Sequence, residues 1–287
     1  MRQSIVSALA MAALHLSFAQ AAPIRVVAAE NFYGDLVEQI GGPQVRVTSI
    51  LANPDQDPHL FEISVSVARR IADADVVVYN GADYDPWMDR LLAASPTAKR
   101  QAIEVAPLVN KKAGDNPHIW YDPRTMPALA VRVADVLSRL DPAHAEAYAD
   151  RVAAFDKSMK GLTDRIGELR REYAGTVVTA TEPVFGYMAE ALGLEMRNQR
   201  FQHAIMNGTE PSAADVAAFE RDLRTRAVRL LLYNSQTGEA LAKRMRSIAT
   251  EAGVPVVGVT ETQPAGKSYQ EWMISELNVL ARALATR

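Results

Sequence analysis

A segment near the middle of the chain has the pattern of one long amphipathic helix. Its apolar residues recur at alternating spacings of four and three, which places them on one helical face: Tyr148, Val152, Phe155, Met159, Leu162, Ile166, Leu169 and Tyr173. We expect Asp141 to cap this helix, Pro142 to lie in its first turn and Gly175 to follow its end. About 32 helical residues, each rising about 1.5 Å, span roughly 48 Å, which is enough to bridge two lobes. A coiled-coil partner could use the same stripe, but the lack of regular flanking charges favours packing against the protein's own lobes, and hence a monomer.

Short apolar runs alternate with helical patterns on both sides of this segment. Before it, strands of a parallel sheet are predicted at 24–28, 45–51, 76–79 and 102–105, and helices at 31–40, 64–72 and 86–94. After it, strands are predicted at 176–180, 194–197, 228–233 and 254–259, and helices at 184–192, 212–225, 238–252 and 269–284. The predicted fold class is α/β: two βα-alternating lobes with mainly parallel four-stranded sheets, joined by one long rigid helix. We place the N-terminal lobe at residues 22–140, the linking helix at 141–174 and the C-terminal lobe at 175–287.

The first 21 residues are typical of a secretion signal. Met1 and Arg2 provide a positively charged start, residues 5–18 are mostly apolar, and residues 19–21 (AQA) fit a signal-peptidase site. No later stretch approaches the roughly 20 apolar residues that span a bilayer. The chain contains no cysteine, so we also expect no lipid anchor. These features predict an exported protein that resides in a periplasm after cleavage of the signal peptide.

The composition and the motifs exclude several classes of function. A formal net charge of −3 lacks the basic footprint of nucleic-acid binding, so no nucleic acid is expected as a partner. The absence of cysteine excludes disulfides, thiolate metal sites and cysteine nucleophiles. The sequence also has no metalloprotease H-E-x-x-H, no G-x-S-x-G, no phosphate-binding loop and no dinucleotide fingerprint.

Two of the five histidines have matching sequence contexts. His59 and His118 each follow a proline directly, and each lies in a loop after a predicted strand of the first lobe. Proline restricts the backbone beside the imidazole, and loops at the carboxyl ends of strands are where α/β sheets bind ligands. His144 at a helix start and His203 in a polar loop have no such context and are interpreted as surface residues.

Two carboxylates occupy comparable places in the second lobe. Glu182 and Glu261 each follow the end of a predicted strand, where an acidic residue can also serve as a helix cap. Together with His59 and His118 they would complete a shell of two nitrogens and two oxygens for a divalent transition metal. The pattern therefore predicts one metal site between the two lobes.

These residues lie within runs that resemble the zinc- and manganese-binding receptors of bacterial ABC importers. The resemblance extends over the whole mature chain, and its runs are 57–62 (DPHLFE), 74–81 (ADVVVYNG), 116–120 (NPHIW), 182–187 (EPVFGY) and 260–262 (TET), followed by Tyr269 and Met273. It implies two α/β lobes bridged by one rigid helix, with a single metal ion as cargo between them. It also implies that the ion is handed to a membrane permease driven by a cytoplasmic ATPase.

The resemblance also implies a role for each candidate ligand. His59 and His118 match the two histidine ligands of the first lobe. Glu182 lies where zinc receptors carry a histidine and manganese or iron receptors a glutamate, and Glu261 lies where an aspartate is usual. No histidine-rich loop precedes His118, unlike in many zinc receptors. The added carboxylate favours Mn²⁺ or Fe²⁺ as the cargo, whereas the Irving–Williams order favours Zn²⁺ over Mn²⁺.

Two other functional classes fit parts of the pattern. A metal-dependent hydrolase could use the same two histidines and two glutamates, but it would need an open coordination position and a separate base. An adhesin or chaperone could use the acidic surface and hold the metal only for structure. Reversible binding of one metal ion without turnover would distinguish a receptor from both.

Overall fold

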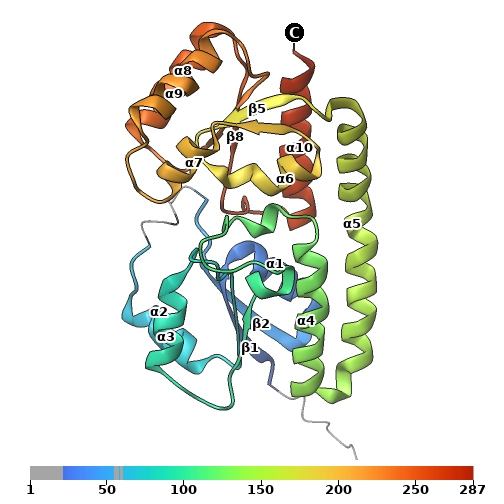
Figure 1. Cartoon of the computed structure of the whole chain (residues 1–287). Helices are drawn as coiled ribbons and strands as arrows, with labels where there is room; N and C mark the ends of the chain where they lie inside the picture. Colours follow the sequence, from blue (N-terminus) through green and yellow to red (C-terminus); the bar gives the residue numbers. More distant parts are fainter. Residues whose placement is uncertain (1–21, 55–57, 59–60, 287) are drawn as a thin grey trace, which may run out of the picture.

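The computed structural model describes residues 22–54, 58 and 61–286. The predicted signal segment and His59 lie outside the described residues. Figure 1 shows two lobes stacked end to end, with one long helix running beside both of them.

The N-terminal lobe is built around a parallel sheet in the order β2-β1-β3-β4. Its strands are β1 (Ile24–Glu30), β2 (Val45–Leu51), β3 (Val76–Tyr79) and β4 (Gln101–Glu104). Its helices are α1 (Asn31–Gly41), α2 (Val65–Asp73), α3 (Pro86–Ala94) and α4 (Thr125–Leu140). All four residues of β3 are buried, because this inner strand is covered on both faces.

The C-terminal lobe repeats this design with a parallel sheet in the order β6-β5-β7-β8. Its strands are β5 (Val177–Ala180), β6 (Glu195–Arg197), β7 (Leu231–Asn234) and β8 (Val256–Val259). Its helices are α6 (Gly186–Ala191), α7 (Gln199–Met206), α8 (Ala213–Arg224), α9 (Ala240–Ala252) and α10 (Tyr269–Ala285). Two sheets of four parallel strands confirm the predicted α/β fold class.

Two helices were not predicted from the sequence. Helix α4 buries an amphipathic face that includes Met126, Leu129 and Val133, although Pro127 lies in its first turn, where proline is tolerated. Helix α7 is short, and it places His203 on an exposed helical surface. The expectation that His203 lies in a loop is therefore wrong.

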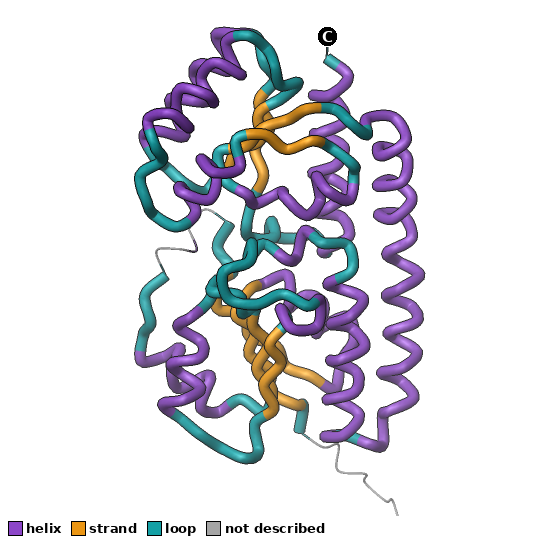
Figure 2. Tube along the Cα trace, in the orientation of Figure 1, coloured by secondary structure: helices purple, strands orange, loops and turns teal. Residues whose placement is uncertain are grey.

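The linking helix α5 (Ala145–Tyr173) has 29 residues and packs against α1 and α4 of one lobe and α10 of the other (Figure 2). Most of its predicted apolar stripe is buried, from Tyr148 to Leu169. Asp141 does not cap it: the carboxylate accepts hydrogen bonds from the His144 ring and the Tyr148 hydroxyl, at 2.7 and 2.8 Å. Helix α5 begins at Ala145, after a short 3₁₀ turn (Pro142–His144), so Pro142 does not lie in its first turn.

One apolar core extends through both lobes. It includes Phe32 and Trp120 from the first lobe and Trp272 from α10, with ring centroids 4.8 and 5.8 Å from Phe32. Polar contacts across the lobe boundary add to this core. The Tyr269 hydroxyl donates to the Trp120 carbonyl at 2.7 Å, and α10 is further anchored at its start by a capping box. Since interiors are close-packed, such an interface resists large movements of one lobe against the other.

Within residues 22–54, 58 and 61–286, every helix is too short or too polar to cross a bilayer.

Candidate metal centre

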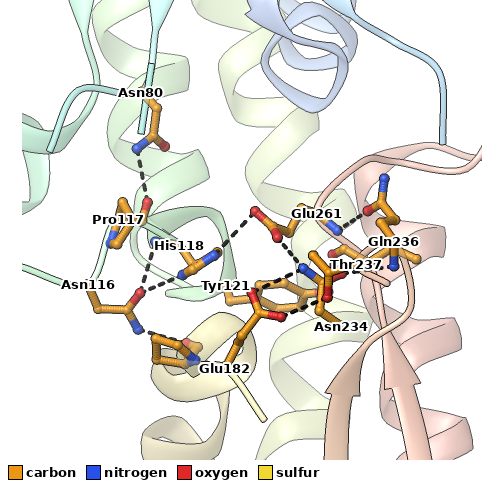
Figure 3. A network of polar contacts seen from close by, with 12 residues as sticks. Asn80, Asn116, Pro117, His118, Tyr121, Glu182, Asn234, Gln236, Thr237 and Glu261 are labelled. Carbon is orange, nitrogen blue, oxygen red and sulfur yellow. Dashed lines mark hydrogen bonds and ion pairs between the residues drawn. The ribbon is translucent and has the colours of Figure 1, made fainter. Parts of the chain in front are cut away.

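Three of the four predicted ligands lie at the boundary between the lobes. His118 directly precedes the 3₁₀ helix η4 (Ile119–Tyr121), in the segment that follows β4 and the 3₁₀ helix η3 (Ala106–Val109). Glu182 and Glu261 follow β5 and β8, two strands that flank β7 in the sheet of the other lobe. Figure 3 shows the His118 ring pointing toward the Glu261 carboxylate, with Glu182 close by.

The His118 ring is fully buried and presents one nitrogen to the other lobe. Its Nδ1 lies 2.7 Å from Oδ1 of Asn116, and the Asn116 amide is oriented by its own donation to the Pro183 carbonyl at 2.8 Å. Because an amide oxygen only accepts hydrogen bonds, Nδ1 carries a proton, and in the neutral ring Nε2 then holds the lone pair. Among the described residues, Nε2 has no hydrogen-bond partner, and it lies 3.3 Å from Oε2 of Glu261. This arrangement orients an imidazole for coordination.

The two glutamates are also removed from solvent, with 5% of Glu182 and 1% of Glu261 exposed. The Thr237 hydroxyl donates to Oε1 of Glu182 at 2.9 Å. The Asn234 side-chain amide donates to Oε2 of Glu182 at 3.4 Å and also to Oε1 of Glu261. Burial raises the pKa of Glu182, and the neighbouring charge of Glu261 raises it further. Two buried carboxylates beside an imidazole lone pair form a site that a cation would stabilise.

The candidate ligands are not all in contact with one another. Nε2 of His118 lies 3.3 Å from Oε2 of Glu261, and the Asn234 amide donates to both Glu261 and Glu182. In the part of the chain that the structure describes, no three His, Asp or Glu side chains form a group that could hold a metal ion. His144 is half exposed and forms an ion pair with Asp141, and His203 is exposed on α7. His59 lies outside the described residues.

A second layer of polar residues supports His118, and the sequence analysis did not identify it. The Asn80 amide donates to the carbonyl of Pro117 at 2.9 Å, and the Tyr33 hydroxyl donates to Oδ1 of Asn80 at 2.6 Å. The Asp85 carboxylate accepts from the backbone N–H groups of Asn80 and Gly81, at 2.7 and 2.8 Å. Asn80 and Asn116 lie within the sequence runs 74–81 and 116–120 that were already singled out, whereas Tyr33 and Asp85 lie outside all of those runs.

Buried acids in this layer carry perturbed pKa values. Burial raises the pKa of Asp85 to about 6, and burial together with Asp85 raises the pKa of Glu30 well above its usual range. Burial therefore favours the neutral form of both acids, which lowers the negative charge behind the candidate site.

The raised pKa of Asp85 predicts how the stability of the metal-free protein changes with pH. The folded state holds the Asp85 proton up to a pH of about 6, whereas the unfolded chain releases it near 3.8. Between these values the unfolded state binds fewer protons, so the free energy of unfolding falls as the pH rises, by up to about 1.4 kcal/mol per pH unit. We expect wild type to lose stability relative to Asp85→Asn over this window in urea unfolding at pH 4, 5, 6 and 7. Parallel pH profiles for the two proteins would contradict the assignment.

Comparison with known proteins places the chain among metal-uptake components. The family model described as "Zinc-uptake complex component A periplasmic" matches residues 26–283. The manganese ABC transporter substrate-binding lipoprotein PsaA of Streptococcus mitis is 23% identical, over 98% of this chain and 96% of its own length. The manganese-binding lipoprotein MntA of Halalkalibacterium halodurans is 24% identical, over 85% of this chain and 80% of its own length. The structure of the periplasmic zinc-binding protein TroA from Treponema pallidum superposes with a TM-score of 0.78 at 20% identity, covering 92% of this chain and all of TroA.

Proposed function

The chain belongs to the family of periplasmic zinc-uptake components, and from this premise we propose that it binds one Mn²⁺, Fe²⁺ or Zn²⁺ ion between its lobes and delivers it to the permease of an ABC importer. Members of the family are metal-binding receptors, so the chain functions as a receptor and the alternative of a metal-dependent hydrolase is not supported.

One observation carries the proposal. The Nε2 lone pair of His118 and the Oε2 atom of Glu261 come from different lobes and face each other at 3.3 Å, away from solvent. A lone pair beside a carboxylate oxygen is repulsive unless a positive charge lies between or next to them. An incoming divalent ion provides that charge, and imidazole nitrogen and carboxylate oxygen are donors that Zn²⁺ and Mn²⁺ both accept.

The ligand set that we propose is His59, His118, Glu182 and Glu261. The contact of His118 with Glu261 supports two of its members. Glu182 is included because it is buried and hydrogen-bonded to the same Asn234 amide as Glu261. His59 is included on its sequence context, since it follows Pro58 as His118 follows Pro117.

The continuous core suggests how an ion enters and leaves. Trp120, Trp272 and Phe32 join the two lobes in one apolar cluster, and α5 packs along both. Exchange of the ion would then depend on movements of loops and side chains at the site, and less on a hinge between the lobes.

The location of the chain follows in part from the family. Family members are extracytoplasmic, and PsaA and MntA are named as lipoproteins. We propose for this chain a cleaved signal peptide ending at Ala21 and no lipid anchor, because the sequence offers a signal-peptidase pattern and no cysteine. We also propose a monomer, because the apolar face of α5 packs against the protein's own two lobes. Mass spectrometry of the exported protein would identify its first residue and any attached lipid.

Metal titration tests the function and the role of Glu182 together. We expect wild type to bind one ion of Mn²⁺ or Zn²⁺ reversibly. We expect Glu182→His to raise the preference for Zn²⁺ over Mn²⁺ about tenfold, or about 1.4 kcal/mol, because imidazole replaces an oxygen donor. Competition calorimetry with both ions measures the ratio. Absence of binding by wild type would refute the function, and an unchanged ratio with both affinities intact would remove Glu182 from the ligand set.

A further inference from the structure

Asn234 lies between the two carboxylates of the candidate metal centre. It is the last residue of β7, which pairs with β5 on one side and with β8 on the other. Glu182 and Glu261 each follow the end of one of these neighbouring strands by two residues. The side chain of Asn234, only 3% exposed, therefore reaches both glutamates (Figure 3).

The orientation of the Asn234 amide is determined by the backbone. Its Oδ1 accepts a hydrogen bond from the N–H of Gln236 at 3.0 Å. Its Nδ2 consequently faces the carboxylates and donates to Oε1 of Glu261 and, at 3.4 Å, to Oε2 of Glu182. A flipped amide would place its oxygen against both carboxylates and lose all three contacts.

The same contacts assign different roles to the two oxygens of Glu261. Oε1 accepts from Asn234, whereas Oε2 lies 3.3 Å from Nε2 of His118. The backbone of Glu261 is also held, since Oε1 of Gln236 accepts from the N–H groups of Glu261 and Thr262, at 2.5 and 3.1 Å. Turning the carboxylate so that both oxygens face His118 would break its hydrogen bond with Asn234.

We propose that Asn234 is a positioning residue that restricts Glu261 to binding the metal through one oxygen and thereby sets the preference of the site between Zn²⁺ and Mn²⁺. This inference rests on the proposed function. Zn²⁺ is satisfied by four ligands, whereas Mn²⁺ is typically surrounded by more oxygen donors. Keeping one oxygen of Glu261 away from the ion lowers the number of donors and favours Zn²⁺. Asn234 thus opposes the effect of Glu182, which supplies an oxygen donor where an imidazole would favour Zn²⁺.

Replacement of Asn234 tests this role. Asn234→Ala removes the hydrogen bond that holds Oε1 of Glu261, so that this oxygen can turn toward the ion. We expect the affinity for Mn²⁺ relative to Zn²⁺ to rise about tenfold in competition titrations, or about 1.4 kcal/mol. X-ray absorption on the Mn²⁺-loaded protein should show about one additional oxygen neighbour. Loss of a merely structural contact would not increase the coordination number.

Two further variants complete the experiment. Asn234→Ser keeps a side-chain oxygen but loses the amide donor, so we expect a smaller change in the same direction if the alanine variant folds poorly. Asn278→Ala is the matched control, because Asn278 on α10 accepts a hydrogen bond from Arg165 at 3.1 Å and is outside the contacts described for the centre. It should leave the ratio of affinities and the coordination number as in wild type.

The outcomes separate this inference from the function on which it rests. If wild type binds neither ion, the proposed function is wrong and the inference falls with it. If wild type binds the ions but both Asn234 variants keep its affinity ratio and coordination number, the function stands and the role of Asn234 is refuted. A parallel loss of affinity for both ions, with the same coordination number, would also refute it.

Discussion

His118→Ala is expected to lower the affinity for Zn²⁺ and Mn²⁺ by at least about 100-fold. Removing a residue that only orients a ligand already weakens metal binding by about 10- to 100-fold, and loss of the ligand itself should cost more. The variant also removes the nitrogen that faces Oε2 of Glu261 at 3.3 Å, so the remaining donors come from one described lobe and from His59. Isothermal titration of the two ions with metal-free protein measures the effect. His59→Ala should cause a loss of similar size if it is the second imidazole ligand.

The histidines outside the candidate centre are the controls for this prediction. His144 is half exposed and paired with Asp141, and His203 is exposed on α7. Alanine at either position should leave both affinities within a factor of about two, since surface substitutions typically change free energies by less than about 0.5 kcal/mol. Equal losses at His144 and His118 would contradict the assignment of the site.

Trp272→Ala is expected to reduce the free energy of unfolding by about 3–5 kcal/mol, the usual cost of replacing a large core aromatic with alanine. Trp272 is 1% exposed, and its ring centroid lies 5.8 Å from those of Phe32 and Tyr121 in the first lobe. The cavity would therefore open at the junction of the lobes. Denaturant unfolding followed by circular dichroism measures the change.

A control on the same helix shows whether the effect comes from the core. Val279 on α10 is 37% exposed, and Val279→Ala should cost less than about 1 kcal/mol. If the core is continuous, wild type and both variants should unfold in one transition. Two separate transitions, of which Trp272→Ala shifts only one, would show that the lobes are energetically independent.

Much of the fold could be predicted because its signals are local. The 4-3 apolar spacing of α5 reflects the period of an amphipathic helix. The continuous apolar run of β3 reflects a strand that is covered on both faces. Both patterns are determined by neighbouring residues. Predictions were less accurate at element ends: Asp141 does not cap α5, because its carboxylate binds His144 and Tyr148. The amphipathic pattern of α4 is present in the sequence, although Pro127 lies in its first turn.

The candidate metal centre likewise has features that the sequence determines and features that only the tertiary structure decides. Sequence by itself placed His118 in a loop after a strand of the first lobe, and Glu182 and Glu261 just after strand ends of the second, where ligands bind to parallel sheets. Only the tertiary structure decided which strand ends lie side by side, because the strand order β6-β5-β7-β8 in the sheet differs from the order along the chain. That order places Asn234 between Glu182 and Glu261, from which it is separated by 52 and 27 residues. Hydrogen bonds act over about 3 Å of space and are indifferent to distance along the chain, so no local pattern could have revealed this contact.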